Sequence, residues 1–120
     1  MSSKVSNKKQ KITPGGEADR LIKICSGVLK HLTNSPTAYA FLVPVDWKGL
    51  KIPQYPKMIM HPMDLGTVEG KLHGGRYANV SDFTADVNLV WDNAQLFNQE
   101  GSDIFDIASQ LRKLGAGKRV

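Results

Sequence analysis

The segment 35–63 constrains the fold most, because it is rich in apolar side chains yet has no sustained helical or strand periodicity. A segment of this length without regular structure is uncommon in a compact domain and is often functional. Only its start, near Thr37–Phe41, has a pattern that would extend a helix. The rest must fold back against helices to hide its side chains, and irregular packing stiffened by proline leaves gaps that form pockets. The prolines are Pro36, Pro44, Pro53, Pro56 and Pro62.

Four amphipathic helices are predicted around this segment, and no strand pattern is present. Each has an apolar stripe at helical spacing, and polar residues stand where helices are normally capped. The predicted helices cover Glu17–Leu32, the residues after Asp64 up to Gly74, the residues after Asn79 or Ser81 up to Phe97, and Ser102–Leu114. The predicted fold class is therefore all-α, with one four-helix bundle at 17–114 and one long crossing loop. Residues 1–16 are predicted to be a disordered basic tail or linker, and 115–120 a frayed C-terminal tail.

The positive charge lies at the two ends of the chain. Residues 1–11 and 112–120 carry eight basic and no acidic residues, whereas 12–111 holds the other eight basic and all 11 acidic residues. A nucleic-acid-binding domain normally carries its positive charge on a folded face. The body is therefore expected to attract a basic polypeptide, with weak nucleic-acid contact left to the tails. The alternative, a helical DNA-binding domain, requires that 17–114 alone still bind duplex DNA with a steep salt dependence.

The residues that support catalysis or metal binding are scattered. The single cysteine, Cys25, falls on an apolar helical stripe and is predicted to be a core residue. His31, His61 and His73 have no cysteine or glutamate at ligand spacing, so no metal site is predicted. No phosphate-binding loop and no nucleophile–base pair is visible, and no apolar run reaches the ~20 residues that span a membrane. We therefore expect neither an enzyme nor a cofactor.

Asn98 stands at the entrance of a short polar break that separates the last two helical patterns. A side-chain amide there offers two donor hydrogens and one acceptor oxygen without net charge. Taken alone, an asparagine at this position is most often a helix C-cap. The apolar face and the phenylalanine before it also place it at the rim of a core.

Four segments, in this order, resemble the motifs of the bromodomain family, and the resemblance covers about residues 17–114. The first matches an aromatic followed by Pro-Val-Asp, the second a Pro-x-Tyr turn, the third a Pro-Met-Asp-Leu signature, and the fourth the segment with the family's binding asparagine. They are Phe41-Leu42-Val43-Pro44-Val45-Asp46, Leu50-Lys51-Ile52-Pro53-Gln54-Tyr55, Ile59-Met60-His61-Pro62-Met63-Asp64-Leu65 and Asp92-Asn93-Ala94-Gln95-Leu96-Phe97-Asn98.

This resemblance implies a left-handed four-helix bundle that binds acetylated lysine between a long ZA-type loop and a short BC-type loop. By position, the Asn98 amide would donate to the acetyl carbonyl, and Tyr55 would contact that carbonyl through a water. Ile104 would stand beside the pocket mouth. Phe97 replaces a tyrosine frequent in the family, which removes a hydroxyl from the rim. The matching wall residues are Phe41, Val45, Leu50 and Ile52.

The same resemblance implies the biological setting. The expected partner is an acetylated histone tail or another acetyl-lysine peptide, read in the nucleus during chromatin and transcription regulation. The isolated domain is expected to be a monomer without membrane contact.

Overall fold

The computed structural model describes residues 16–117, and all regular structure within that range is helical. The predicted all-α class with four main helices is confirmed. In chain order the elements are α1 (Glu17–Thr33), the 3-10 helix η1 (Ala38–Phe41), α2 (Tyr55–Met58), α3 (Leu65–His73), α4 (Val80–Phe97) and α5 (Asp103–Gly117). The basic segments 1–15 and 118–120 lie outside the described residues.

Helix α1 matches its prediction to within one residue at its end. Its apolar stripe buries Cys25, Leu29 and Leu32. Glu17 and Asp19 lie in the first turn, where the helix dipole favours negative charge. The predicted place of Cys25 in the core is confirmed, because its side chain is fully buried.

Polar side chains begin α3 and α4 as predicted. Asp64 caps α3: one carboxylate oxygen accepts from the Thr67 backbone N–H at 2.9 Å, and the other accepts from the Thr67 hydroxyl at 2.6 Å. Of the two candidates for α4, Asn79 is the cap, since its Oδ1 accepts from the Asp82 N–H at 2.8 Å. Ser81 lies two residues after Asn79 and is itself inside the helix.

Helix α5 is longer than predicted, so the expected fraying of residues 115–117 is wrong. Gly115 faces α1, where an added Cβ would lie 3.4 Å from the Leu32 Cδ2 atom. The small residue lets the two helices approach, and this packing offsets the poor helix propensity of glycine. Local propensity alone predicted the helix end at Leu114.

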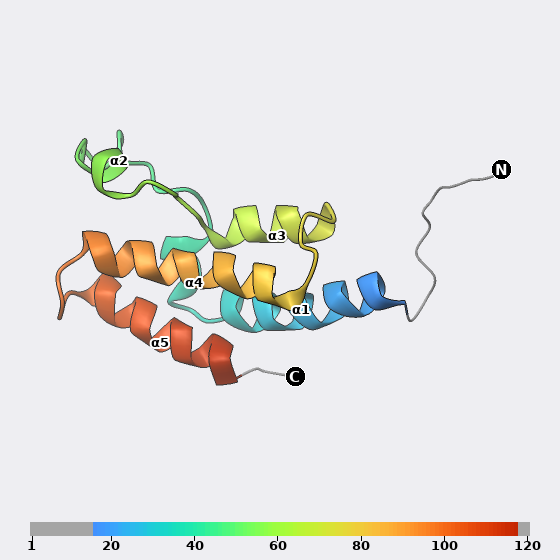
Figure 1. Ribbon diagram of the computed structural model, residues 1–120. Coiled ribbons are helices and arrows are strands. Elements are labelled where there is room, and N and C mark those ends of the chain that lie inside the picture. Colours follow the sequence, from blue (N-terminus) through green and yellow to red (C-terminus); the bar gives the residue numbers. More distant parts are fainter. Residues whose placement is uncertain (1–15, 118–120) are drawn as a thin grey trace.

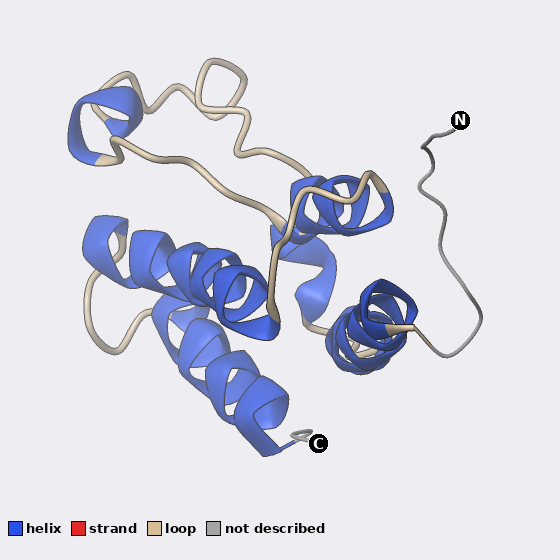
Figure 2. Ribbon diagram, turned by 45° about the vertical axis from the view of Figure 1, so that its right-hand side comes forward, coloured by secondary structure: helices blue, strands red, loops and turns tan. Residues whose placement is uncertain are grey.

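The four long helices form a ring in which α1 and α4 each pack against both α3 and α5 (Figures 1 and 2). Trp91 of α4 lies at the centre and is 1% exposed. The ring of Phe41 from η1 meets it edge-on, with centroids 5.2 Å apart and planes at 83°. The other buried members of the core are Cys25, Leu29, Leu32, Ala38, Leu65, Val68, Leu72, Tyr77, Phe83, Val87, Val90, Ala108 and Leu111.

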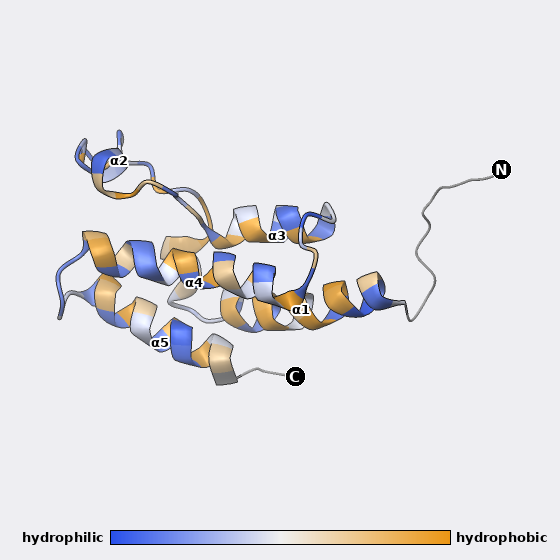
Figure 3. Ribbon diagram, viewed as in Figure 1, coloured by the Kyte–Doolittle hydropathy of each residue, from blue (hydrophilic) through white to orange (hydrophobic). Residues whose placement is uncertain are grey.

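The segment 42–64, here called the long loop, connects η1 to α3 and carries α2 at its outer end, beside the C-terminal end of α4 (Figure 1). Figure 3 shows that part of it is hydrophobic. The expectation that it hides its apolar side chains holds for Tyr55 and Ile59, which are buried. It is wrong for Val43, Leu50 and Met60, which are 64%, 62% and 72% exposed. The long loop therefore presents apolar surface next to the end of the bundle.

A polar network joins α3 to α4 away from the long loop. The Tyr77 hydroxyl donates to Asp86 Oδ2 at 2.7 Å, and Lys71 Nζ donates to the same oxygen at 2.6 Å. The Tyr77 ring also packs edge-on against Phe83. Burial, and then the hydrogen bond to the Asp86 carboxylate, raise the pKa of the Tyr77 phenol well above its ordinary range.

This raised pKa predicts a loss of stability in alkali. An unfolded tyrosine releases its proton near its ordinary pKa of about 10, whereas folded Tyr77 keeps it, so the free energy of unfolding falls as pH rises above that value. Tyr77→Phe should lower stability at neutral pH by about 1 kcal/mol through the lost hydrogen bond. It should also flatten the decline between about pH 9 and 11. Urea unfolding over this pH series tests the prediction, and parallel curves for the two proteins would contradict it.

Candidate functional site

Asn98 ends α4 as its C-cap, with extended backbone angles (φ −99°, ψ 150°). Its backbone N–H donates to the Ala94 carbonyl oxygen at 3.0 Å, and its side-chain Nδ2 donates to the same oxygen at 2.8 Å. The amide nitrogen carries two hydrogens and this bond uses one. Within residues 16–117, the second hydrogen and the Oδ1 acceptor have no recorded hydrogen-bond partner. The capping role and a ligand-binding role are therefore compatible in one side chain.

Tyr55 and Phe97 bring the long loop against the end of α4. Their rings meet in a T-shaped arrangement, with centroids 5.0 Å apart and planes at 65°. Tyr55 is buried, and this burial raises the pKa of its phenol, so the hydroxyl stays neutral and can donate a hydrogen bond. Phe97 immediately precedes Asn98, and the ring pair thus lies beside the polar end of α4.

Two other predicted site residues belong partly or wholly to the core. Phe41 is 7% exposed, and its edge-on contact with Trp91 makes it part of the core, directly before the long loop in the chain. Ile104 lies in the first turn of α5 and packs, partly buried, against the core cluster. Both lie at the same end of the bundle as the long loop.

The remaining predicted wall residues lie on a compact turn in the long loop, at 45–52. Asp46 organises this turn: its carbonyl accepts from the Leu50 N–H at 2.9 Å, and its side chain accepts from the Gly49 N–H at 3.0 Å. Val45 and Leu50 are exposed and Ile52 is half-buried. Their apolar groups are thus available to a ligand. Within the described residues, the hydrogen bonds of Asn98 go to Ala94 and not to this turn.

Two anchors of the long loop were missed from sequence. The backbone N–H of Gly66 donates to the Leu42 carbonyl at 3.1 Å, which closes the base of the long loop. The side-chain amide of Asn93 donates to the His61 carbonyl at 2.8 Å. The one available signal was a polar residue, Asn93, one turn before Phe97 and one turn after Leu89 in an amphipathic helix.

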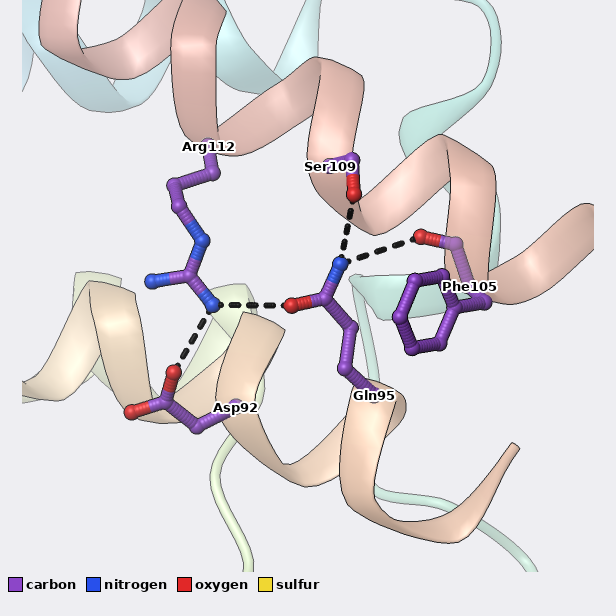
Figure 4. A network of polar contacts seen from close by, with 5 residues as sticks. All are labelled: Asp92, Gln95, Phe105, Ser109 and Arg112. Atoms are coloured by element: carbon purple, nitrogen blue, oxygen red, sulfur yellow. Dashed lines mark hydrogen bonds and ion pairs between the residues drawn. The ribbon is translucent and has the colours of Figure 1, made fainter. Parts of the chain in front are cut away.

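A second polar network fixes α5 to the last two turns of α4 (Figure 4). The amide nitrogen of Gln95 donates to Ser109 Oγ at 2.6 Å and to the Phe105 carbonyl at 3.2 Å. Arg112 donates to the Gln95 amide oxygen at 3.1 Å and to Asp92 Oδ1 at 2.7 Å. Arg112 was expected in a basic tail. It instead lies in α5 and pairs with an acid, so it adds little positive charge for nucleic acid.

Two cavities lie elsewhere in the bundle. One, of about 670 Å³, lies between α1, α4 and α5 and includes Cys25 and Trp91 in its lining. The other, of about 490 Å³, lies between the start of α1 and the residues around Tyr77. Neither is lined by Asn98. In the described part of the chain, no helix is long and apolar enough to cross a membrane, and no cluster of His, Cys, Asp and Glu suits a metal ion.

Comparison with known proteins assigns the chain to a family. The family model described as Bromodomain matches residues 25–110, which include every predicted site residue. The chain belongs to the bromodomain family. Among the relatives of this bromodomain, transcription factor GTE9 of Arabidopsis thaliana is 44% identical over 93 residues, which cover 78% of this chain and 14% of GTE9. Bromodomain-containing factor 1 of Candida albicans is 41% identical over 86 residues, 69% of this chain and 12% of the relative.

A solved structure agrees with this assignment. The second bromodomain of Candida albicans Bdf1, bound to an imidazopyridine, superposes on this bromodomain with a TM-score of 0.77. The two are 37% identical, and the match covers 86% of this chain and 98% of the Bdf1 chain. The chain spans only about a fifth or less of the length of these and other curated relatives, between 4% and 21%.

Proposed function

We propose that this bromodomain is a non-catalytic reader of acetylated lysine, with Asn98 as the donor to the acetyl carbonyl. The observation that carries the proposal is the Asn98 amide, which is held by Ala94 through one N–H and keeps a second donor beside the Tyr55–Phe97 ring pair. A donor already oriented by the protein loses little rotamer freedom when the ligand arrives.

The proposed chemistry follows from what acetylation does to lysine. Acetylation replaces a strongly hydrated ammonium with a neutral amide. Apolar walls from Val45, Leu50, Ile52 and Ile104 would accept the methyl group and the butyl stem, at ~0.8 kcal/mol per buried CH₂. They would reject the ammonium, because burying an unpaired charge is very costly. The acetyl carbonyl still needs a donor, and leaving it unpaired would cost ~1–3 kcal/mol.

We propose acetylated histone tails as partners, nuclear localisation and a role in transcription regulation. The supporting observations are the relatives, one of them a transcription factor, and the net negative charge of residues 12–111, which suits the basic residues that surround an acetylated site in a histone tail.

Titration of matched peptides tests the proposed function. Acetylated histone-tail peptides should bind with a dissociation constant of about 10–100 µM, since the buried group is small and association itself is costly. The unacetylated peptides should bind at least about tenfold more weakly, because one lost buried contact of this kind is worth about 1.4 kcal/mol. Equal affinity for both forms, or no binding across a broad panel, would refute the proposal. Binding of duplex DNA by residues 17–114 without the tails would favour the alternative.

A further inference from the structure

We propose that Asn93 is a positioning residue for acetyl-lysine binding. It holds the backbone of the long loop near His61 against α4, so that the loop keeps a fixed position relative to Asn98. This inference rests on the proposed function. Asn93 does not itself reach the ligand in this proposal. Asn93 acts through the backbone of the long loop near His61. It controls the fraction of molecules in which this part of the long loop is packed against α4.

The hydrogen bond of Asn93 is long-range, and it joins a buried donor to the backbone of an exposed residue. Its Nδ2 donates to the His61 carbonyl at 2.8 Å, across 32 residues of sequence. The Asn93 residue is only 8% exposed, and among residues 16–117 it is one of two buried polar or charged residues, together with Asp64. Asp64 has a capping role within its own helix. A buried amide without a hydrogen-bond partner costs free energy. Conformations in which the His61 carbonyl accepts from Asn93 are therefore favoured.

The placement of Asn93 on α4 explains why it bears on the site. Asn93 and Phe97 are four residues apart, so their side chains lie one above the other on one face of the helix. Phe97 contacts the ring of Tyr55, the first residue of α2, and Asn93 binds the backbone of His61, three residues after α2 ends. Two positions on one face of α4 thus hold the long loop on either side of the α2 turn. Asn98 follows at the end of the same turn. The contacts of Asn93 and Phe97 thus set the position of the long loop relative to Asn98.

Few other contacts orient this part of the long loop. Met58, Met60, His61 and Pro62 are exposed. Ile59 is buried, and its backbone N–H donates to the Tyr55 carbonyl at 2.8 Å. That bond closes the end of α2 and does not join the long loop to α4. When the competent state is only partly populated, the apparent dissociation constant rises by the inverse of that fraction. Loss of one hydrogen bond of ordinary strength therefore predicts binding weakened by about fivefold to tenfold.

The test uses Asn93→Asp, which keeps the shape of the side chain and loses the donor at neutral pH. We expect affinity for acetylated histone-tail peptides to fall by at least about fivefold to tenfold, because the ionised carboxylate cannot donate and also repels the His61 carbonyl oxygen. Amide hydrogen exchange at 59–61 should accelerate. Because burial raises a carboxyl pKa and a protonated carboxyl regains a donor, affinity should recover as pH is lowered from about 8 to about 5. Wild type over the same pH range controls for pH effects that do not depend on the substitution.

Tyr77→Phe is the matched stability control, since it also removes one buried hydrogen bond, at a distance from the long loop. It should leave affinity and exchange at 59–61 unchanged. The positioning role is overturned if Asn93→Asp binds acetylated peptide as tightly as wild type, if its affinity shows no recovery at low pH, or if Tyr77→Phe weakens binding equally. Failure of the proposed function is recognised separately, because wild type would then not distinguish acetylated from unacetylated peptide. The positioning role would fall with it, even if exchange at 59–61 still responded to Asn93→Asp.

Discussion

Asn98→Ala is expected to abolish measurable binding of acetylated peptides and to lower the free energy of unfolding by only about 1 kcal/mol. The binding loss is large because the substitution removes the proposed donor and would leave a buried acetyl carbonyl unpaired. The stability loss is small because the Ala94 carbonyl, which loses the side-chain donor, still accepts from the Asn98 backbone N–H at 3.0 Å. Calorimetric titration with acetylated histone-tail peptides gives the first quantity, and urea unfolding gives the second.

Asn79→Ala is the matched control, because it removes a capping asparagine from the other end of the same helix. The loss of an N-cap typically costs about 1 kcal/mol, so both variants should be destabilised to a similar degree. Only the variant at Asn98 should lose binding. If Asn98→Ala binds as tightly as wild type, the assignment of the site is wrong. If Asn79→Ala loses binding as well, the effect reflects the integrity of α4.

Gly66→Ala is expected to destabilise the fold by about 2–4 kcal/mol, the combined effect of overpacking and a broken hydrogen bond. A Cβ at this position would lie only 2.4 Å from the Leu42 carbonyl oxygen, which belongs to the backbone and cannot rotate away. The Gly66 N–H also donates to that same oxygen, so relief of the clash opens the base of the long loop. Urea unfolding followed by circular dichroism measures the effect.

Gly70→Ala provides a control of opposite sign within the same helix. Apart from its chain neighbours and the backbone of its own helix, no atom lies within 4 Å of the position of an added Cβ at Gly70. Alanine is favoured over glycine inside helices, so this variant should be stabilised by about 0.5–1 kcal/mol. Similar stability of the two variants would show that the close approach of Leu42 to α3 is not a constraint on the fold.

Local patterns were sufficient to predict the helices. The apolar stripe of α1 and the capping positions Asp64 and Asn79 depend on residues within one or two turns, and the structure confirms all three. The end of α5 was predicted too early because it depends on Leu32, more than 80 residues earlier in the chain. The small size of Gly66 is likewise required by the backbone of Leu42, a tertiary contact that no local pattern signals.

The path of the long loop could not be predicted from sequence, because its anchors join residues far apart in the chain. The bond from Asn93 to His61 and the ring contact between Tyr55 and Phe97 are tertiary contacts that no local periodicity signals. For the site, the structure packs the ring of Tyr55 against Phe97, the residue before Asn98, and it places Phe41 in the core. The roles of these residues toward acetyl-lysine stay predictions.

The burial of Cys25 has a practical consequence for separating global opening from local movement. It is the single thiol of the chain, and its side chain is 0% exposed between α1 and the rest of the bundle. A thiol reacts through its thiolate, and burial raises the pKa of the Cys25 thiol, so modification requires an opening of the bundle around α1 that exposes this side chain. The rate at which Cys25 is labelled therefore reports opening of the bundle around α1. It should not respond to motions confined to the long loop and the C-terminal end of α4.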